Sequence, residues 1–253
     1  PSQDIYFVSN FTGDPMVRDS AGFISKVTPD GEIDMMKFMT GTNEHPLHSP
    51  RGMFITGDTL WAADLDGVHG FNRTSGEQVA FVDFTDFNPG FLNDIAAGPE
   101  GALYVTDTGT SKLYKISGSG VTVAADSLPH PPNGVTLSAD GNRLILAPWG
   151  GGTEFHAWNP GEGNLEKAAT LDEGGNFDGI EIVDGRWVIT SQADSSLHVF
   201  SDGKSWQFIH TTGAPADLGI DTKRNRVAVP YVDRNEVDIW PLPKESEEEA
   251  SGY

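Results

Sequence analysis

The chain has 253 residues, of which 37% are hydrophobic and 10% aromatic, and its 30 glycines and 16 prolines favour an all-β chain with many turns and few long helices. Its formal net charge of −21 repels polyanions, so we expect neither nucleic acid nor an anionic membrane as a partner. The absence of cysteine excludes disulfides and thiolate metal sites, and no apolar run approaches the ~18 residues that would span a bilayer.

The first predicted strands cover residues 5–10, 22–27 and 33–38. From residue 49 onward one unit recurs: a short apolar segment led by a polar residue, a turn, a strongly β-prone segment and then further strands. Its five opening segments are residues 49–57, 91–99, 131–139, 176–184 and 215–223. The β-prone strands that follow them are residues 60–65, 103–108, 144–149, 187–192 and 227–232.

The polar residues that lead these segments are 42, 40, 45 and 39 residues apart, which matches the repeat of a four-stranded propeller blade. We therefore predict an all-β, six-bladed β-propeller with four-stranded antiparallel blades. The pattern contains twenty-two strands, whereas six complete blades would need about twenty-four. We expect the first inner strand and the outer strand that closes the ring to be missing at the N-terminus, ahead of Pro1.

Residues 1–243 are expected to form a single propeller domain, because no shift in composition marks a linker. Residues 244–253 are acidic and lack apolar periodicity, so they are expected to be a solvated tail. The triple glycine at 150–152 lies between two predicted strands and is expected to connect them, not to cradle a phosphate.

The first strand of every propeller blade lines the central channel, and its start lies at one mouth of that channel. One residue from each repeat should therefore converge there, although the residues are distant in sequence. From this chain the ring comprises Arg51, Asn93, Asn133, Asp178 and Asp217.

Two amides and two carboxylates at one mouth form a set rich in oxygen, which a hard cation such as Ca²⁺ prefers. We predict Asn93, Asn133, Asp178 and Asp217 as ligands of a divalent cation. The alternative is that Asn and Asp set only the turn into each inner strand, since both residue types tolerate turn geometry.

Three segments resemble the SMP-30/gluconolactonase family: PPNGVTLSADGNRL at 131–144, NFDGIEIVDGRWVIT at 176–190 and FLNDIAAGPEGALYVTDT at 91–108. The resemblance implies a divalent-metal site with Asn133 and Asp178 as ligands, and Asn93 as a ligand or a substrate contact. Asp178 is then the candidate base or water-orienting carboxylate. The family's remaining ligand, a Glu on the first inner strand, would precede this chain. Phe91 stands where related sugar-lactone hydrolases often carry Arg, which argues against a gluconolactone-like substrate.

Three further residues are predicted to contact a substrate at the mouth. His48 precedes the inner strand of the second unit and could relay protons, or it is an ordinary exposed loop histidine. Arg51 could be a counter-ion for the carboxylates or a clamp for a substrate carboxylate. Trp149 follows a second strand and could reach the mouth, or it packs between blades like the other aromatic residues.

The sequence supports a metal-dependent hydrolase of a lactone or other small ester, with a small molecule as its partner. A non-catalytic NHL-like propeller that binds a small ligand or a protein on its top face is the competing hypothesis. A structural Ca²⁺ deep in the channel, without chemistry, is the third. We expect a monomer, and a periplasmic or secreted location is slightly favoured over a cytoplasmic one.

Overall fold

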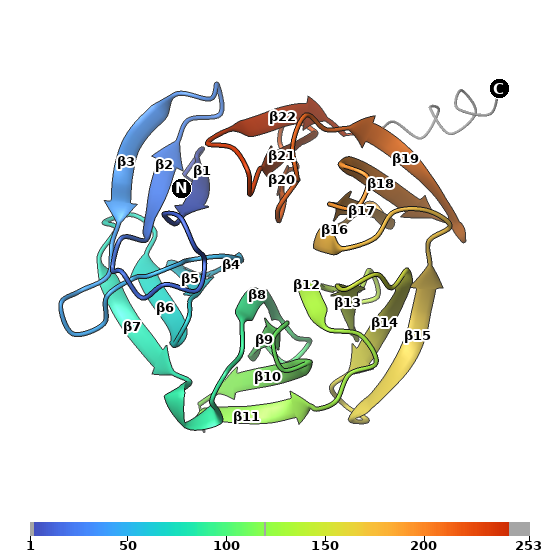
Figure 1. The fold of residues 1–253 in the computed structure, drawn as a ribbon, viewed down its shortest axis with the longest axis horizontal. Helices are drawn as coiled ribbons and strands as arrows, with labels where there is room; N and C mark the ends of the chain where they lie inside the picture. The colour runs from blue at the N-terminus through green and yellow to red at the C-terminus, as the bar shows by residue number, and fades with distance from the viewer. Residues whose placement is uncertain (1–2, 119, 243–253) are drawn as a thin grey trace.

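The computed structural model describes residues 3–118 and 120–242, which form six β-sheets arranged as a ring around a central axis (Figure 1). Blade 1 comprises β1 (Tyr6–Asn10), β2 (Phe23–Val27) and β3 (Ile33–Met39). Blade 2 comprises β4 (Met53–Thr56), β5 (Thr59–Ala63), β6 (Gly67–Asn72) and β7 (Gln78–Asp83). Blade 3 comprises β8 (Leu92–Ala97), β9 (Leu103–Asp107), β10 (Lys112–Ser117) and β11 (Gly120–Ala125).

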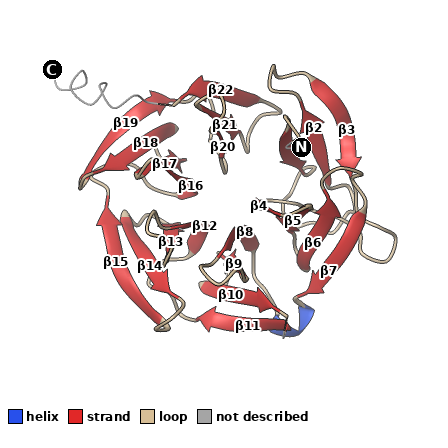
Figure 2. Ribbon diagram, turned by 180° about the vertical axis from the view of Figure 1, so that it is seen from behind, coloured by secondary structure: helices blue, strands red, loops and turns tan. Residues whose placement is uncertain are grey.

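Blade 4 comprises β12 (Pro132–Leu137), β13 (Leu144–Pro148), β14 (Glu154–Asn159) and β15 (Asn164–Thr170). Blade 5 comprises β16 (Phe177–Val183), β17 (Arg186–Ser191), β18 (Ser196–Ser201) and β19 (Lys204–His210). Blade 6 comprises β20 (Gly219–Asp221), β21 (Arg226–Pro230) and β22 (Val237–Pro241). Seen from behind, the described chain consists of strands joined by loops and turns, with one short 3₁₀ helix, η1 (Thr85–Phe87) (Figure 2).

The six-bladed, antiparallel architecture confirms the fold predicted from the repeat. In blades 2 to 6 the strands follow one another outward from the channel, with β4, β8, β12, β16 and β20 innermost (Figure 1). Four blades have four strands, while the described residues of blades 1 and 6 form three strands each. The predicted acidic tail, residues 244–253, lies outside the described residues. The described residues contain no helix long and apolar enough to cross a membrane.

Apolar side chains pack mainly between neighbouring blades, which is what holds a ring of twisted sheets together. One buried cluster joins Tyr104 and Leu113 of blade 3 to Leu144 and Trp158 of blade 4. Another joins Phe155 of blade 4 to residues of blade 5. The Val-, Ile- and Leu-rich second strands are buried in these clusters, in agreement with their uninterrupted apolar sequence.

In blades 2, 3, 5 and 6 the loop that leads into the inner strand is held by a side chain at or beyond the end of that blade's second strand. Asp107 accepts hydrogen bonds from the N–H groups of Gly90 and Phe91, which lie three and two residues before Asn93. Asp64 accepts in the same way from His48 and Ser49, before Arg51. Ser191 and Asp233 perform this task for blades 5 and 6, at Gly175 and Ala214. These hydrogen bonds therefore fix the position at which the chain enters each of these inner strands.

Three glycines let neighbouring inner strands approach each other closely. A Cβ on Gly134 would lie 2.3 Å from the carbonyl oxygen of Asp178, and a Cβ on Gly179 would lie 2.6 Å from Asp217 Oδ1. A Cβ on Gly52 would lie 2.2 Å from Asp94 Oδ1. None of the three has a positive φ. The glycine that follows a ring residue is thus required by close packing around the axis and not by a turn.

Threonines of the second strands tie neighbouring blades together at the same level. Thr106 Oγ1 donates to the carbonyl oxygen of Asn133 at 2.6 Å. Thr190 Oγ1 likewise donates to the carbonyl oxygen of Ala216 at 2.7 Å. Because these bonds run from one blade to the inner strand of the next, they fix the ring residues relative to one another.

Candidate functional site at the channel mouth

Asn93, Asn133 and Asp178 each occupy the second position of an innermost strand, on β8, β12 and β16, which lie side by side around the channel (Figure 1). Arg51 and Asp217 stand two residues ahead of β4 and β20, in the loops that enter those strands. The register read from the repeat thus places five polar residues at corresponding points of five consecutive blades.

Asn133 is the most buried of these residues, with 3% of its surface exposed. Its side chain donates a hydrogen bond to the Asp178 carboxylate, yet its own Oδ1 has no partner. An unpaired, buried amide oxygen is costly unless a donor or a cation meets it. Asn133 Oδ1 therefore marks a point where a bound cation or water belongs.

Asn93 adds a second amide beside this point. Its Nδ2 donates to Thr108 Oγ1 at 3.0 Å, and Thr108 donates in turn to the carbonyl oxygen of Pro132. These bonds fix the orientation of the amide and leave Asn93 Oδ1 without a hydrogen bond from the described residues. Near the start of β8, Asn93 Oδ1 is thus a free acceptor next to β12.

Asp178 is half-buried, and desolvation together with the charge of Asp217 raises its pKa to about 8. Gln192 Nε2 donates to Asp178 Oδ2 at 2.6 Å, and this bond and the one from Asn133 partly oppose the rise. Desolvation also raises the pKa of Asp217 to about 6. Without a compensating cation, the mouth holds carboxyl groups that resist ionisation.

Two more carboxylates lie in the channel that the sequence pattern did not single out. Burial, and then the charge of Asp217, raises the pKa of Glu181 to about 7, and the same two causes raise that of Asp94 well above its ordinary value. Asp94 accepts hydrogen bonds from the N–H groups of Ile95 and Val135, each at 2.7 Å. Glu181 accepts one from Thr136 Oγ1 at 3.1 Å. A charged residue inside an apolar inner strand was the signal that could have revealed both.

Arg51 does not point freely into the channel. Its Nη1 donates to the carbonyl oxygen of Leu92 at 3.1 Å and its Nη2 to that of Pro15 at 2.6 Å. The guanidinium carbon lies 3.7 Å from the centroid of the Phe91 ring, a cation–π geometry. Desolvation lowers the Arg51 pKa to about 10, an effect that the charge of Asp64 partly offsets. In this arrangement Arg51 ties loop 11–22 to the mouth.

His48 and Trp149 lie near the mouth in different roles. His48 is 7% exposed, its Nδ1 accepts the Ser20 N–H at 3.0 Å, and its Nε2 faces Asp66 Oδ2 at 3.9 Å. The Trp149 side chain is half-buried, and the backbone N–H of Trp149 donates to the carbonyl oxygen of Pro131, two residues before Asn133. Trp149 therefore borders the segment that carries Asn133, whereas His48 faces into blade 2.

A second group of potential ligands, also missed from the sequence, lies off the axis in blade 2. Asp64, Asp66 and His69 each offer an atom within 4.8 Å of the others, so together they could hold a metal ion. His69 Nε2 lies 3.5 Å from Asp64 Oδ2 and 4.0 Å from Asp66 Oδ1. His69 Nε2 and Asp66 Oδ1 are buried without hydrogen-bond partners. The sequence signal was the run Asp-Leu-Asp-Gly-Val-His at 64–69.

The hydrogen bonds around this group set a condition on metal binding. Gln78 Oε1 accepts the Thr42 N–H, so the Gln78 amide nitrogen faces His69 Nδ1 and donates to it. Neutral His69 then carries its proton on Nε2, which is the nitrogen that a metal would need. Both oxygens of Asp64 already accept backbone N–H groups. A metal here would have to displace a proton.

The fold is that of the SMP-30/gluconolactonase-like six-bladed propellers, as comparison with solved structures shows. A gluconolactonase from Xanthomonas campestris superposes with a TM-score of 0.69 at 18% identity, over 87% of this chain and 79% of that one. A putative gluconolactonase gives 0.66 at 17% identity, over 88% and 83%. A catalytically inactive histidine-to-alanine variant of virginiamycin B lyase from Staphylococcus aureus, solved with quinupristin, gives 0.62 at 15% identity, over 82% and 69%.

No protein-family model matches the sequence, and no curated protein sequence matches it either. The gluconolactonases and lyases thus share a fold with this chain, and its chemistry has to be argued from its own residues.

Proposed function

We propose that this protein is a metal-dependent hydrolase of a lactone or another small ester, acting at the mouth of the central channel. The observation that carries the proposal is Asn133 Oδ1, an unpaired acceptor in a residue 3% exposed, beside the desolvated Asp178 carboxylate. A hard cation at this point would satisfy the amide oxygen and allow Asp178 to ionise.

The donor set fits Ca²⁺ better than a soft metal. Asn93, Asn133, Asp178 and Asp217 offer oxygen atoms only, and no cysteine exists in the chain. A bound Ca²⁺ would polarise the carbonyl of a substrate and make nearby water more acidic. Asn93 Oδ1 and Asn133 Oδ1 would hold the ion, since neither accepts a hydrogen bond from the described residues.

Asp178 is the residue best placed to orient a water molecule. Gln192 fixes one of its oxygens, and Asn133 donates to the same carboxylate. A cation bound beside Asp178 would lower its pKa, and the ionised carboxylate could then take a proton from water during ester hydrolysis. A bound cation would also favour ionisation of Glu181 and Asp217, and their negative charge would then help to hold the ion.

Both kinds of structural neighbour bear on the reaction class. Two are described as gluconolactonases, and a histidine-to-alanine change inactivates the virginiamycin B lyase. The histidine that the sequence predicted at the mouth, His48, is buried, and its Nδ1 already accepts the Ser20 N–H. It is therefore poorly placed to act as a base on a substrate, which favours hydrolysis assisted by Asp178 over a histidine-based lyase reaction.

The proposal is tested by measuring turnover of a panel of lactones and aryl esters before and after removal of divalent cations with a chelator. We expect turnover that the chelator abolishes and that added Ca²⁺ restores. The Asp178→Asn variant should lose at least about 100-fold in kcat/KM, in line with loss of a general base. Turnover that persists in excess chelator would reject the mechanism. A folded protein that binds Ca²⁺ and turns over nothing in the panel would favour the non-catalytic, ligand-binding alternative.

A further inference from the structure

Blades 2 and 4 carry a pair of histidines at corresponding positions. His48 and His130 each lie three residues before a ring residue, and His69 and His156 are each the third residue of the third strand of their blade. In blade 2 both rings accept an N–H at Nδ1, from Ser20 and from Gln78. In blade 4 no such donor reaches His130, which has no hydrogen bond with any residue in the described part of the chain.

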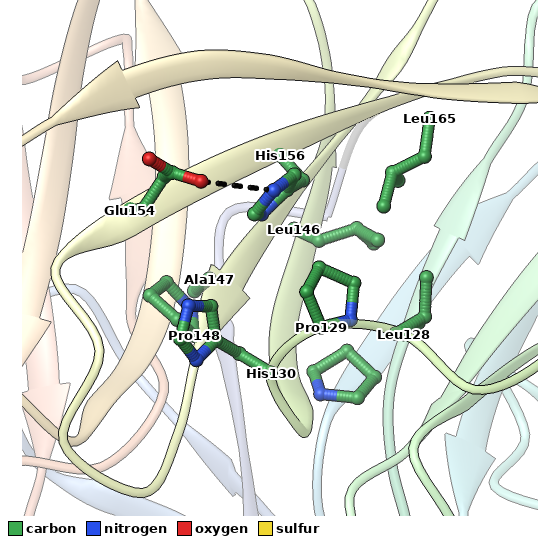
Figure 3. A pocket seen from close by; sticks show the side chains of 10 residues that line it. Leu128, Pro129, His130, Leu146, Ala147, Pro148, Glu154, His156 and Leu165 are labelled. Carbon is green, nitrogen blue, oxygen red and sulfur yellow. Dashed lines mark ion pairs between the residues drawn. The ribbon is translucent and has the colours of Figure 1, made fainter.

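The two blade 4 histidines and a carboxylate line part of a small cavity, whose other lining side chains are apolar (Figure 3). The ring centroids of His130 and His156 are 6.0 Å apart, and the rings are inclined at 46°. His156 Nε2 lies 3.2 Å from Glu154 Oε1, while Glu154 Oε2 pairs with Lys167 Nζ at 2.6 Å. The cavity, of about 10 Å³, corresponds to roughly one water-sized sphere.

We propose that His130, His156 and Glu154 form a binding site for a borderline transition-metal cation, with Zn²⁺ as the representative ion. Two imidazoles and one carboxylate are a donor set that such ions favour, with water completing the coordination. The site is separate from the oxygen-rich channel mouth and does not depend on the proposed hydrolase activity.

The distance between His156 and Glu154 suits a shared metal. Two ligands bonded to one tetrahedral zinc at about 2.0–2.1 Å lie about 3.3 Å apart, close to the 3.2 Å observed between Nε2 and Oε1. The His156 ring also donates a hydrogen bond to the backbone carbonyl of Glu154. A metal-binding histidine typically donates its other ring N–H to such a carbonyl, which leaves the remaining nitrogen free for the ion. Burial lowers the His156 pKa, which favours the neutral ring that a metal requires.

His130 is the ligand that must move. Its nitrogens do not yet complete a set within 4.8 Å, a condition that only Asp64, Asp66 and His69 meet among the described residues. The His130 ring is half-buried and unrestrained by hydrogen bonds, so a rotation about its side-chain bonds can bring a nitrogen toward the cavity. Gly152 provides the space for this ring, because a Cβ there would lie 2.8 Å from His130 Nδ1 and Cε1.

The cavity borders a larger pocket of about 310 Å³, since Leu128, Pro129 and Leu165 line both. The acidic protein, with a formal net charge of −21, also favours the approach of cations in general. Only the neutral His156 ring can bind the ion, so protonation of the ring competes with binding and the affinity should fall as the pH is lowered.

The test is a Zn²⁺ titration of the full chain by calorimetry, in the presence of saturating Ca²⁺ to fill the channel mouth. We expect one saturable Zn²⁺ site whose Kd rises about 100-fold in His130→Gln and in His156→Gln, and about tenfold in Gly152→Ala, which displaces a ligand without removing it. Two controls should leave the Kd unchanged: His210→Gln, which removes an exposed histidine, and Asp66→Asn, which removes a potential ligand in blade 2.

A spectroscopic readout guards against variants that fail to fold. Cu²⁺ bound in place of Zn²⁺ should show coupling to two imidazole nitrogens in the unaltered chain and to one in His130→Gln, which is the safest change because His130 lies outside the strands and is only half-buried. The proposal is overturned if Zn²⁺ binding survives in His130→Gln, if it disappears in Asp66→Asn, or if no saturable binding occurs.

Discussion

The side chain of Asn133 donates a hydrogen bond to Asp178 across the boundary between β12 and β16, while its own carbonyl oxygen has no partner. The two residues are 45 positions apart in sequence and meet only because corresponding blade positions converge on the channel. Asn133 is only 3% exposed; its amide N–H is used in a hydrogen bond, while its amide oxygen is left free. This is the arrangement expected of a cation ligand.

Replacing Asn133 with Leu should abolish Ca²⁺ binding and lower kcat/KM by at least about 100-fold, because it removes an oxygen ligand together with a hydrogen bond to Asp178. Asn142→Leu, which changes an exposed residue of the same blade, is the matched control. Calorimetric titration with Ca²⁺ and initial-rate measurements check both effects. Unaltered Ca²⁺ affinity in Asn133→Leu would remove the basis of the proposed site.

The cation-free protein should become less stable as the pH rises. The folded-state pKa values of Asp178, Glu181 and Asp217 are raised to about 8, 7 and 6, so the folded chain binds more protons than the unfolded chain. Stability is then greatest below about pH 4 for these groups and declines up to about pH 8. Melting temperatures measured across this range, with and without Ca²⁺, check the effect. Ca²⁺ should remove most of the decline, and a melting temperature that increases with pH in its absence would contradict the account.

Gly134→Ala should destabilise the fold by about 1–3 kcal/mol and impair the site, because its Cβ would lie 2.3 Å from the carbonyl oxygen of Asp178. Gly219→Ala is the matched control, since Gly219 also lies on an innermost strand but has no atom within 4 Å of such a Cβ. Urea unfolding of both variants measures the difference. Equal stability of Gly134→Ala and Gly219→Ala would show that β12 and β16 do not approach each other this closely.

Arg51→Met should loosen loop 11–22 and cost about 1.5–3 kcal/mol, because it removes charged hydrogen bonds to the carbonyl oxygens of Leu92 and Pro15. Hydrogen exchange should become faster in loop 11–22 and remain unchanged in blade 5. Arg143→Met, which removes exposed ion pairs with Asp140 and Glu166, is the control and should cost at most about 1 kcal/mol.

The same variant distinguishes the two roles considered for Arg51. If Arg51 binds a substrate carboxylate, KM should rise for anionic lactones only. If it positions the loop, as its two carbonyl partners indicate, KM should change equally for anionic and neutral lactones.

The fold could be predicted because the period near forty residues and the apolar second strands follow directly from blade geometry. The relative positions of Asn93, Asn133 and Asp178 followed from the same repeat. The glycines beside them were harder to interpret, since Gly134 and Gly179 accommodate the neighbouring strand and do not form turns. That role depends on contacts between blades, which a repeat pattern does not contain.

For a related reason, the sequence could mark other residues as unusual but could not show what they do. Asp94 and Glu181 matter because burial raises their pKa values, and burial depends on the closed channel. The roles of Arg51 and His48 depend on loop 11–22, which lies beside blade 2 although it precedes that blade in the chain (Figure 1). Irregular loops of this kind carry no periodic signal.

The most direct test of the proposed channel site is anomalous diffraction from a crystal soaked in Ca²⁺. We predict a peak within about 2.3–2.6 Å of Asn133 Oδ1 and of an Asp178 carboxylate oxygen, with Asn93 Oδ1 beside it. A well-ordered channel mouth with no peak, or a peak only at Asp64 and Asp66 in blade 2, would contradict the proposal.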